Sequence, residues 1–399
     1  MPLRLIACAA FVVACTINTV FGQYTPQQII AAYGINNISF GGSPATGAAQ
    51  TIAIVDAYND SAIQSDLQSF DSRFGIPDAP SFSIVNQGGG TTLPTATNAG
   101  WAIEMDTDVE LAHAIAPQAN ILLVETNDNS LINLTAGVAT AAATTGVSVV
   151  TTNWGSAEFL GVNTFDSNFI TPANHSGVTF VATAGGSGGV SYPASVPSVL
   201  AVGGTSLQLD SSGKYAGETT WDDDSGIGGG GTSIVEGEPT YQNGVQASGF
   251  RTTPDVAFDA DLTTGFYGIE NGTLAVMGTA NAAAANWAGL IALADQGRAI
   301  NGLNPLDSSD LTNGLLPMLY ALYGTPDYAL AFNDITTGLT ATGQSVGAGY
   351  DTSTGLGSPK ADVLIPYLAG YGIVVPEPCS TCLLLLGAPF LMRRRIASN

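Results

Sequence analysis

Residues 51–56 read Thr-Ile-Ala-Ile-Val-Asp, an uninterrupted run of apolar and β-branched residues that ends at an aspartate. A run without polar alternation is typical of a strand buried on both faces of a parallel sheet. We therefore expect a strand over 51–55 and a turn at Asp56. Similar runs follow at residues 121–124, 147–151, 178–182 and 199–202.

Alanine-rich segments that favour helices separate or follow these runs, at residues 102–116, 131–145 and 286–296. The alternation of strand and helix predicts an α/β fold with a mostly parallel central sheet. The 49 glycines cluster at 185–189, 226–231 and 347–349, which suits turns where the backbone approaches another group closely. Neither of the two common glycine-rich phosphate-binding patterns is found.

Composition excludes several classes of function. Apolar residues make up 45% of the 399 residues, which is enough for a large core, and the formal net charge is −23. With nine Lys and Arg residues against 32 Asp and Glu, no basic patch can form, so we expect no nucleic acid and no anionic membrane surface as a partner. Two histidines and a body without cysteine disfavour a zinc site, a disulfide framework and a Ser-His-Asp triad.

Both ends of the chain resemble export signals. Residues 1–22 combine Arg4, an apolar stretch and small residues, which is typical of a secretory signal peptide cleaved before Gln23. A lipoprotein cleavage box that ends at Cys15 is an alternative. Residues 373–399 hold Val-Pro-Glu-Pro, a short apolar run and three arginines, and resemble the PEP-CTERM sorting tail of Gram-negative bacteria; a plain C-terminal membrane anchor is the alternative.

Two carboxylates stand four residues apart in the helical segment, at Glu104 and Asp108. On a helix this spacing places both on one face. Taken alone, such a pair is typical of a solvated acidic surface. The wider pattern, E-x-x-x-D-x-E-x-A-x-A-x-A-P from Glu104 to Pro117, resembles the catalytic helix of the sedolisin (serine-carboxyl peptidase) family.

Further stretches match this family in the same order over nearly the whole body, residues 23–372. They are Tyr24-Thr-Pro-Gln-Gln with Ala32-Tyr33-Gly34, Trp154-Gly155, Val202-Gly-Gly-Thr205, Trp221 with the glycine run, 251–259, Gly278-Thr279, Trp287-Ala288, Asp334-Ile-Thr and 349–359. The resemblance implies a subtilisin-like three-layer fold and an endopeptidase suited to acid. It begins almost at the expected cleavage site, so we expect no propeptide.

In that family a serine attacks the peptide carbonyl, a glutamate takes the serine proton, an aspartate bonds that glutamate, and a second aspartate stabilises the oxyanion. Carboxylates can serve as bases in acid because their pKa lies near the working pH. The resemblance places Glu104 and Asp108 in the roles of the glutamate and its partner. Asp56 resembles the aspartate of standard subtilisins, but no His-Gly-Thr-His stretch follows it.

The other two catalytic positions depart from the family. Where the family has Gly-Thr-Ser, this chain has Ala280 in place of the serine; aligning on Trp287 instead puts Asn281 there. Gly186 replaces the oxyanion aspartate, with Ser187 as a weaker donor beside it. The nearest remaining hydroxyl is that of Thr279.

The resemblance also implies one bound Ca²⁺. Its ligands would be the side chains of Asp334 and Asp351 and the backbone carbonyls of Ile335, Gly347 and Gly349. Calcium prefers six to eight oxygen ligands, and two carboxylates would neutralise its charge. An Asp- and Gly-rich surface turn without an ion is the alternative.

From these observations we expect a secreted or surface-displayed sedolisin-like domain that has lost catalysis. We expect it to be a monomer that meets the export and sorting machinery and holds a polypeptide or a surface-matrix ligand. An active acidic serine-type endopeptidase with a displaced nucleophile is the main alternative. A purely structural surface module is the second.

Overall fold

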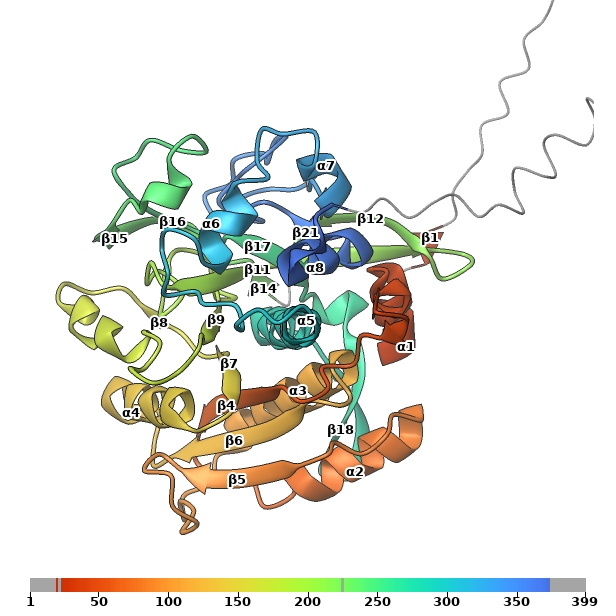
Figure 1. Ribbon diagram of the computed structural model, residues 1–399, viewed down its shortest axis with the longest axis vertical. Coiled ribbons are helices and arrows are strands. Elements are labelled where there is room, and N and C mark those ends of the chain that lie inside the picture. The colour runs from red at the N-terminus through yellow and green to blue at the C-terminus, as the bar shows by residue number, and fades with distance from the viewer. Residues whose placement is uncertain (1–18, 21–22, 224–225, 374–399) are drawn as a thin grey trace, which may run out of the picture.

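A large, mostly parallel sheet forms the centre of the molecule (Figure 1). The computed structural model describes residues 19–20, 23–223 and 226–373, and over these residues the sheet has nine strands. Its path is β1-β11-β9-β7-β4-β6-β5, with β12 and β17 also paired to β11. The strands are β1 Thr19–Val20, β4 Thr51–Ala57, β5 Phe82–Asn86, β6 Asn120–Thr126, β7 Val147–Thr152, β9 Thr179–Thr183, β11 Val199–Asp210, β12 Tyr215–Thr220 and β17 Val256–Asp259.

Within this sheet, β1 and β12 are antiparallel to β11, and the other pairs are parallel. Short antiparallel pairs decorate it. They are β2 Ser39–Phe40 with β3 Ser43–Pro44, β8 Ser156–Ala157 with β10 Ser191–Tyr192, β13 Asp222–Asp223 with β14 Gly226–Ile227, β15 Gly231–Gly237 with β16 Phe250–Thr253, β18 Phe266–Glu270 with β19 Thr273–Met277, and β20 Phe332–Asn333 with β21 Ser358–Pro359.

Helices cover both faces of the sheet. They are α1 Pro26–Ala32, α2 Ile63–Phe74, α3 Ala99–Ile115, α4 Leu131–Ala143, α5 Ala280–Ile300, α6 Leu315–Tyr320, α7 Tyr328–Ala331 and α8 Ala361–Pro366. Strand β4 shows how the layers form, because its side chains alternate between two apolar clusters. Ile52 and Ile54 pack with α3 and α5, whereas Ala53 and Val55 pack with α4. Burial on both faces explains the continuous apolar run.

The expected α/β class and parallel sheet are confirmed. All five predicted strands form, and the helix predicted at 102–116 runs from Ala99 because Asn98 caps it, accepting the amides of Gly100 and Trp101. The helix predicted at 286–296 is longer, Ala280–Ile300. The predicted turn at Asp56 is wrong: Asp56 lies inside β4, paired in register with Glu125 of β6.

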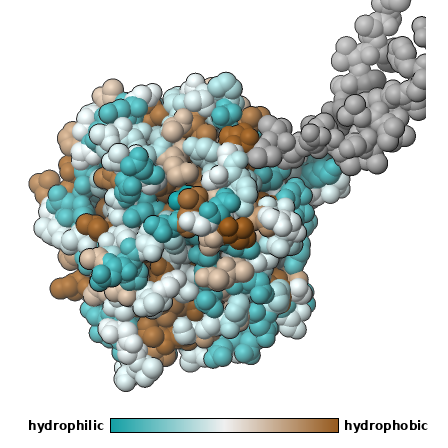
Figure 2. Space-filling model, viewed as in Figure 1, coloured by the Kyte–Doolittle hydropathy of each residue, from teal (hydrophilic) through white to brown (hydrophobic). Residues whose placement is uncertain are grey.

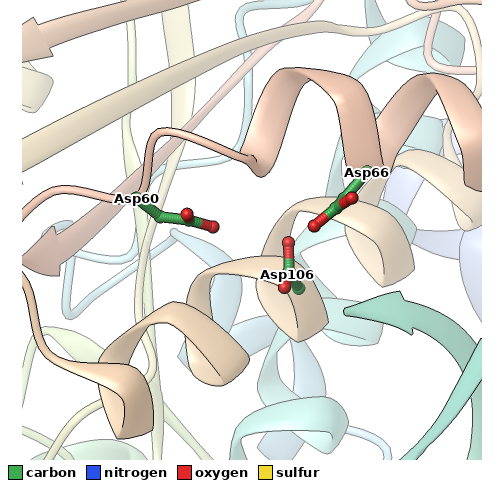
Figure 3. A group of neighbouring side chains, drawn as sticks. All are labelled: Asp60, Asp66 and Asp106. Atoms are coloured by element: carbon green, nitrogen blue, oxygen red, sulfur yellow. The ribbon is translucent and has the colours of Figure 1, made fainter. Parts of the chain in front are cut away.

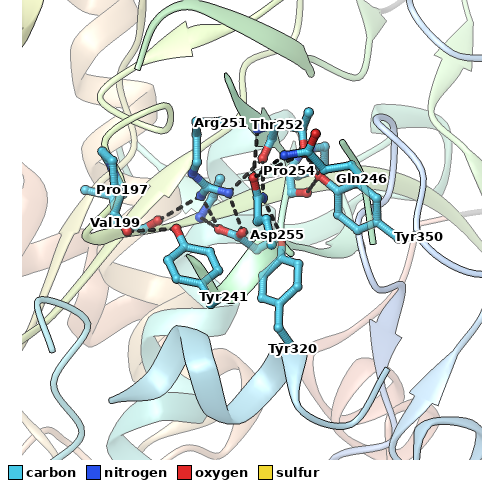
Figure 4. A network of polar contacts seen from close by, with 12 residues as sticks. Pro197, Val199, Tyr241, Gln246, Arg251, Thr252, Pro254, Asp255, Tyr320 and Tyr350 are labelled. Carbon is cyan, nitrogen blue, oxygen red and sulfur yellow. Dashed lines mark hydrogen bonds and ion pairs between the residues drawn. The ribbon is translucent and has the colours of Figure 1, made fainter. Parts of the chain in front are cut away.

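A buried ion pair joins Arg251 of β16 to Asp255, which lies between β16 and β17 (Figure 4). Arg251 donates to both carboxylate oxygens of Asp255 at 2.7 and 2.6 Å, and both side chains are fully buried. The Tyr320 hydroxyl and the Ala201 amide also donate to Asp255. Because the charges are paired and hydrogen-bonded, they are tolerated in the core and tie β11 to α6.

Across the described ranges, no helix is both long enough and apolar enough to cross a bilayer. On the face shown in Figure 2, hydrophobic residues lie scattered among hydrophilic ones. The sorting tail and almost all of the signal peptide lie outside the described residues; Thr19 and Val20 pair with the end of β11.

Candidate active-site cleft

A cleft of about 510 Å³ opens at the carboxyl ends of the central parallel strands. Ligand sites of open α/β sheets commonly lie at this edge. Its lining includes Trp101, Glu104, Asn153, Gly186, Ser187 and Asn281. The sheet and the two long helices α3 and α5 therefore bring together residues that are up to 180 positions apart. Four of them, Glu104, Gly186, Ser187 and Asn281, were singled out in the sequence.

Glu104 lies on α3 at the wall of the cleft and is partly buried. Its Oε2 accepts a hydrogen bond from the side-chain amide of Asn281. Burial raises the pKa of Glu104, while hydrogen bonding from Asn281 and Thr279 acts in the opposite direction. The carboxyl group is thus partnered by a neutral amide at the point where a catalytic glutamate of this kind would meet a hydroxyl.

Asp108 lies one helical turn beyond Glu104 and is completely buried. Among the described residues, neither of its oxygens has a partner at hydrogen-bonding geometry, although the side chain of Asn153 is close enough to favour its charged form. Burial raises the pKa of Asp108 well above its ordinary range, and the negative charges of Asp56 and Glu104 add to the effect. Glu104 and Asp108 share one face of α3, as expected. That face points toward the cleft and the core rather than toward the outer surface.

Asp56 joins this pair from β4, which the sequence did not predict. Only 1% of it is exposed, and burial together with the charges of Glu104 and Glu125 raises the pKa of Asp56 to about 8. No Lys, Arg or His side chain forms an ion pair with these carboxyl groups in the described part of the chain. Because these three carboxyl groups lie close together without a counter-ion, the pKa of each is raised.

Of the two residues considered for the nucleophile position, Asn281 rather than Ala280 faces Glu104. Ala280 is 2% exposed and packs in the core, whereas Asn281 lines the cleft and contacts Glu104. Thr279 caps α5 by accepting the Asn281 amide at 3.3 Å and does not line the cleft. Of the two alignments considered from the sequence, the one anchored on Trp287 agrees with this geometry.

Gly186 lies in the loop after β9 and lines the cleft, as its place in the sequence predicts. A Cβ atom added there would lie 3.0 Å from Cη2 of Trp221, so the indole ring fills space next to the position of the missing side chain. Ser187 lines the same wall. The described cleft therefore offers no carboxylic acid at Gly186 to donate to an oxyanion.

Of the residues expected to bind calcium, Asp334, Gly349 and Asp351 lie close together. Both oxygens of Asp334 accept the Gly349 amide, at 3.0 and 2.9 Å, and Asp351 accepts the amides of Ser353 and Thr354. Burial raises the pKa of Asp351, partly offset by these amides, and the charge of Asp334 adds to the rise.

The carbonyls expected at this site are available. Within the described residues, the backbone oxygens of Ile335, Gly347 and Gly349 accept no hydrogen bond. Two carboxylates and three carbonyls without donors suit a hard divalent cation. The residues present therefore fit the ion that the resemblance implies.

Fold and cleft together define the class: an α/β peptidase-like domain whose helix α3 places Glu104 at a cleft at the sheet edge, with Asp108 buried one turn behind it. The model of the subtilase family matches residues 66–313, more than half of the chain, and the chain belongs to that family. The subtilisin-like fold expected from the sequence is thereby confirmed.

Individual relatives are serine-carboxyl peptidases. Kumamolisin from Bacillus sp. (strain MN-32) is 31% identical over 84% of this chain and 62% of its own length. Sedolisin from Pseudomonas sp. (strain 101) is 33% identical over 46% of this chain and 31% of its own length. The chain thus spans less than two thirds of either relative.

A solved structure agrees with this relationship. Pseudomonas sedolisin, a serine-carboxyl proteinase complexed with two molecules of pseudo-iodotyrostatin, superposes with a TM-score of 0.76 at 26% identity. The match covers 89% of this chain and all of that structure. A lanthipeptide protease shares only the fold, with a TM-score of 0.52 at 12% identity.

Proposed function

We propose that this protein is a pseudo-protease: a sedolisin-like domain that holds polypeptide in its cleft without cleaving it. The observation that carries the proposal is the contact between Asn281 and Glu104. A glutamate base is present, but the group it faces is an amide, which has no hydroxyl to deprotonate. A base without a nucleophile forms no acyl-enzyme.

Energetics support the loss of catalysis. In subtilisin, removal of the serine alone lowers kcat about 10⁶-fold. Loss of one oxyanion donor typically costs a further ~10²–10³-fold. With Asn281 and Gly186 at the two positions, both losses apply to this cleft.

The cleft itself remains suited to an extended chain. Its walls combine the indole of Trp101 with a glycine-rich backbone segment at 185–189, and short strands β8 and β10 form part of the rim. Backbone amides and carbonyls at such a rim can pair with an extended peptide, while aromatic side chains supply apolar contact. A polypeptide ligand therefore fits the site better than a small anion or nucleotide.

A displaced nucleophile is the second candidate, and one observation favours it. The Thr279 side chain interacts with Glu104 strongly enough to favour its charged form, as a hydroxyl next to a base would. Against it, Thr279 caps α5 and does not line the cleft, so a bound peptide would have to approach from a different side.

Incubation of the purified protein with unstructured peptides between pH 3 and 7 separates the two candidates. We expect no cleavage beyond that of Glu104→Ala, which serves as a control for contaminants. Peptide binding should persist and weaken about ten- to a hundredfold in Trp101→Ala, because burial of an aromatic side chain is worth about 1.5–3 kcal/mol. Cleavage that disappears in both Glu104→Ala and Thr279→Val would instead establish Thr279 as the nucleophile and end the pseudo-protease proposal.

Export to the cell surface and a bound calcium ion complete the proposal. The terminal signals and a body without cysteine support secretion, and the cluster of oxygens around Asp334 and Asp351 supports calcium. Intact mass of protein released from the cell surface tests export: we expect a chain that begins at Gln23 and ends near Pro378. A lipid on Cys15 would contradict that cleavage site.

A further inference from the structure

Asp60, Asp66 and Asp106 form a second group of buried carboxylates (Figure 3). Asp106 lies two residues from Glu104 on α3, so it points away from the side of the helix that borders the cleft. Asp60 comes from the loop after β4, Asp66 from the first turn of α2, and Asp106 from α3. One oxygen of each lies within 4.8 Å of the others, and the three side chains point toward one another. The relative exposures are 9%, 1% and 1%.

These carboxylates are short of partners. Asp60 accepts the Ala62 amide at 2.8 Å, and Asp66 accepts the Gly272 amide at 2.8 Å through Oδ1. Among the described residues, Oδ2 of Asp66 and Oδ1 of Asp106 have no hydrogen-bond partner. No Lys, Arg or His side chain there forms an ion pair with any of the three. Buried oxygens aimed at one another without a donor between them repel one another unless a proton or a cation lies between them.

The spacing fits a metal ion. Oxygen ligands of Ca²⁺ lie about 2.3–2.6 Å from the ion, so two ligands on opposite sides are about 5 Å apart and adjacent ones are closer. Three oxygens within 4.8 Å can therefore share one ion. The donors are oxygens alone, without sulfur or nitrogen, which favours a hard divalent cation over zinc or copper.

We propose that Asp60, Asp66 and Asp106 bind a divalent cation such as Ca²⁺ or Mn²⁺, at a site separate from the cleft and from Asp334 and Asp351. The ion would join three segments: the loop after β4, α2 and α3. It would also anchor the turn between β18 and β19, since Gly272 of that turn donates to Asp66. The role is structural, holding the outer side of α3 in place.

Cation counting on the full chain tests the proposal. Protein stripped with chelator and dialysed against CaCl₂ or MnCl₂ should carry one ion per chain more than Asp106→Asn or Asp66→Asn does. Asparagine keeps the acceptor oxygen that Asp66 offers to Gly272, so these variants should fold. The matched control is Asp78→Asn, an exposed aspartate after α2 that should leave the count unchanged.

Two further measurements keep the outcome decisive. Asp351→Asn should lose a different ion and leave the one that depends on Asp106. Melting in chelator reports whether each variant folds, and the rise in Tm on adding cation should be smaller in Asp106→Asn than in the parent. If the parent, Asp66→Asn and Asp106→Asn bind equal numbers of ions, or the cation raises their Tm equally, the site does not exist.

Discussion

Helix α3 carries carboxylates on two opposite sides, and the two sides differ in what they meet. Residues two apart on a helix point about 200° away from each other, so Glu104 and Asp108 face one way and Asp106 the other. The first side borders the cleft, where the amides of Asn281 and Asn153 favour the charged forms. The second side meets Asp60 and Asp66.

The difference shows how one helix can keep acids buried by two physical routes. At the cleft, neutral amides and shared protons moderate the repulsion, so the acids remain titratable. On the other side, Asp60 and Asp66 each accept one backbone amide, and the remaining oxygens meet other carboxylates, where a cation would balance the charge. Strand β4 and the loop after it serve both sides, with Asp56 at the cleft and Asp60 at the second group.

The largest expected effect is restored proteolysis at the cleft side. Asn281→Ser combined with Gly186→Asp returns a hydroxyl to Glu104 and a carboxylic acid to the oxyanion position. We expect peptide cleavage in acid at least about 100-fold above the parent, because each group restores a separate part of the barrier. The Trp221 ring must move by a few tenths of an ångström to admit the new Cβ. Release of peptide fragments, followed by mass spectrometry, measures the effect.

The matched control is Ala280→Ser combined with Gly186→Asp. Since Ala280 is buried in the core and does not line the cleft, its hydroxyl should give no activity. Equal activity in both double variants would show that Asn281 does not occupy the nucleophile position.

The second effect concerns the buried ion pair of Arg251 and Asp255, which, unlike the carboxylates of α3, has a charged partner within the described residues. Arg251→Met leaves Asp255 buried and uncompensated, and we expect a loss of about 3–5 kcal/mol in the free energy of unfolding, measured with urea. Arg298→Met is the control, because Arg298 is partly exposed and donates only to the carbonyls of Asn304 and Leu368. Equal losses in the two variants would contradict the special role of the buried pair.

The sequence predicts the fold well for a physical reason. Strands buried on both faces are continuous apolar runs, and such runs are visible without a structure. Helix ends were harder: α5 begins at Ala280 because Thr279 caps it, and nothing in the alanine-rich run marks that position as the start. The turn predicted at Asp56 is absent because Asp56 continues β4 and its buried side chain lies beside Asp108.

The four-residue interval predicts only that Glu104 and Asp108 share one face of α3. Their place in a site follows from the resemblance to the sedolisin family, because the interval alone is typical of a solvated acidic surface. Ala280 and Asn281 are neighbours on α5, so their side chains point about 100° apart. Which of them faces the cleft depends on the rotation of α5 about its axis, and the sequence does not give that rotation. The group of Asp60, Asp66 and Asp106 joins three separate segments, and only the packing of α2 against α3 brings them together.

The third effect is the stabilisation of the fold by calcium at Asp334 and Asp351, a site that, unlike the group on α3, also offers backbone carbonyl oxygens. Calcium at about 100 times its Kd should stabilise the fold by about 2.7 kcal/mol through this site, since only the native state binds the ion. Melting of Asp106→Asn with and without calcium isolates the contribution of Asp334 and Asp351. If adding Asp351→Asn leaves the calcium-dependent rise in Tm unchanged, these residues do not bind the ion.

The smallest effect is a change in pH dependence at the cleft side. The pKa of Asp56 rises to about 8 in the fold through burial and the charges of Glu104 and Glu125, while an unfolded aspartate titrates near 4. The fold therefore retains a proton that the unfolded chain releases, so the stabilisation is complete below about pH 4 and is lost as the pH rises through about 8. The full shift of about four units would be worth about 5 kcal/mol.

Because neighbouring acids titrate over the same range and share this repulsion, we expect Asp56→Asn to reduce the fall in unfolding free energy between pH 4 and 8 by about 2 kcal/mol. An amide does not ionise, so the variant has no proton to retain or release at this position. Urea unfolding in chelator at the two pH values measures the fall, and Asp78→Asn, which is exposed, should match the parent. If the unfolding free energy of Asp56→Asn falls as steeply as that of the parent, Asp56 is already ionised in the fold. The two sides of α3 would then differ in the arrangement of their carboxylates but not in their protonation.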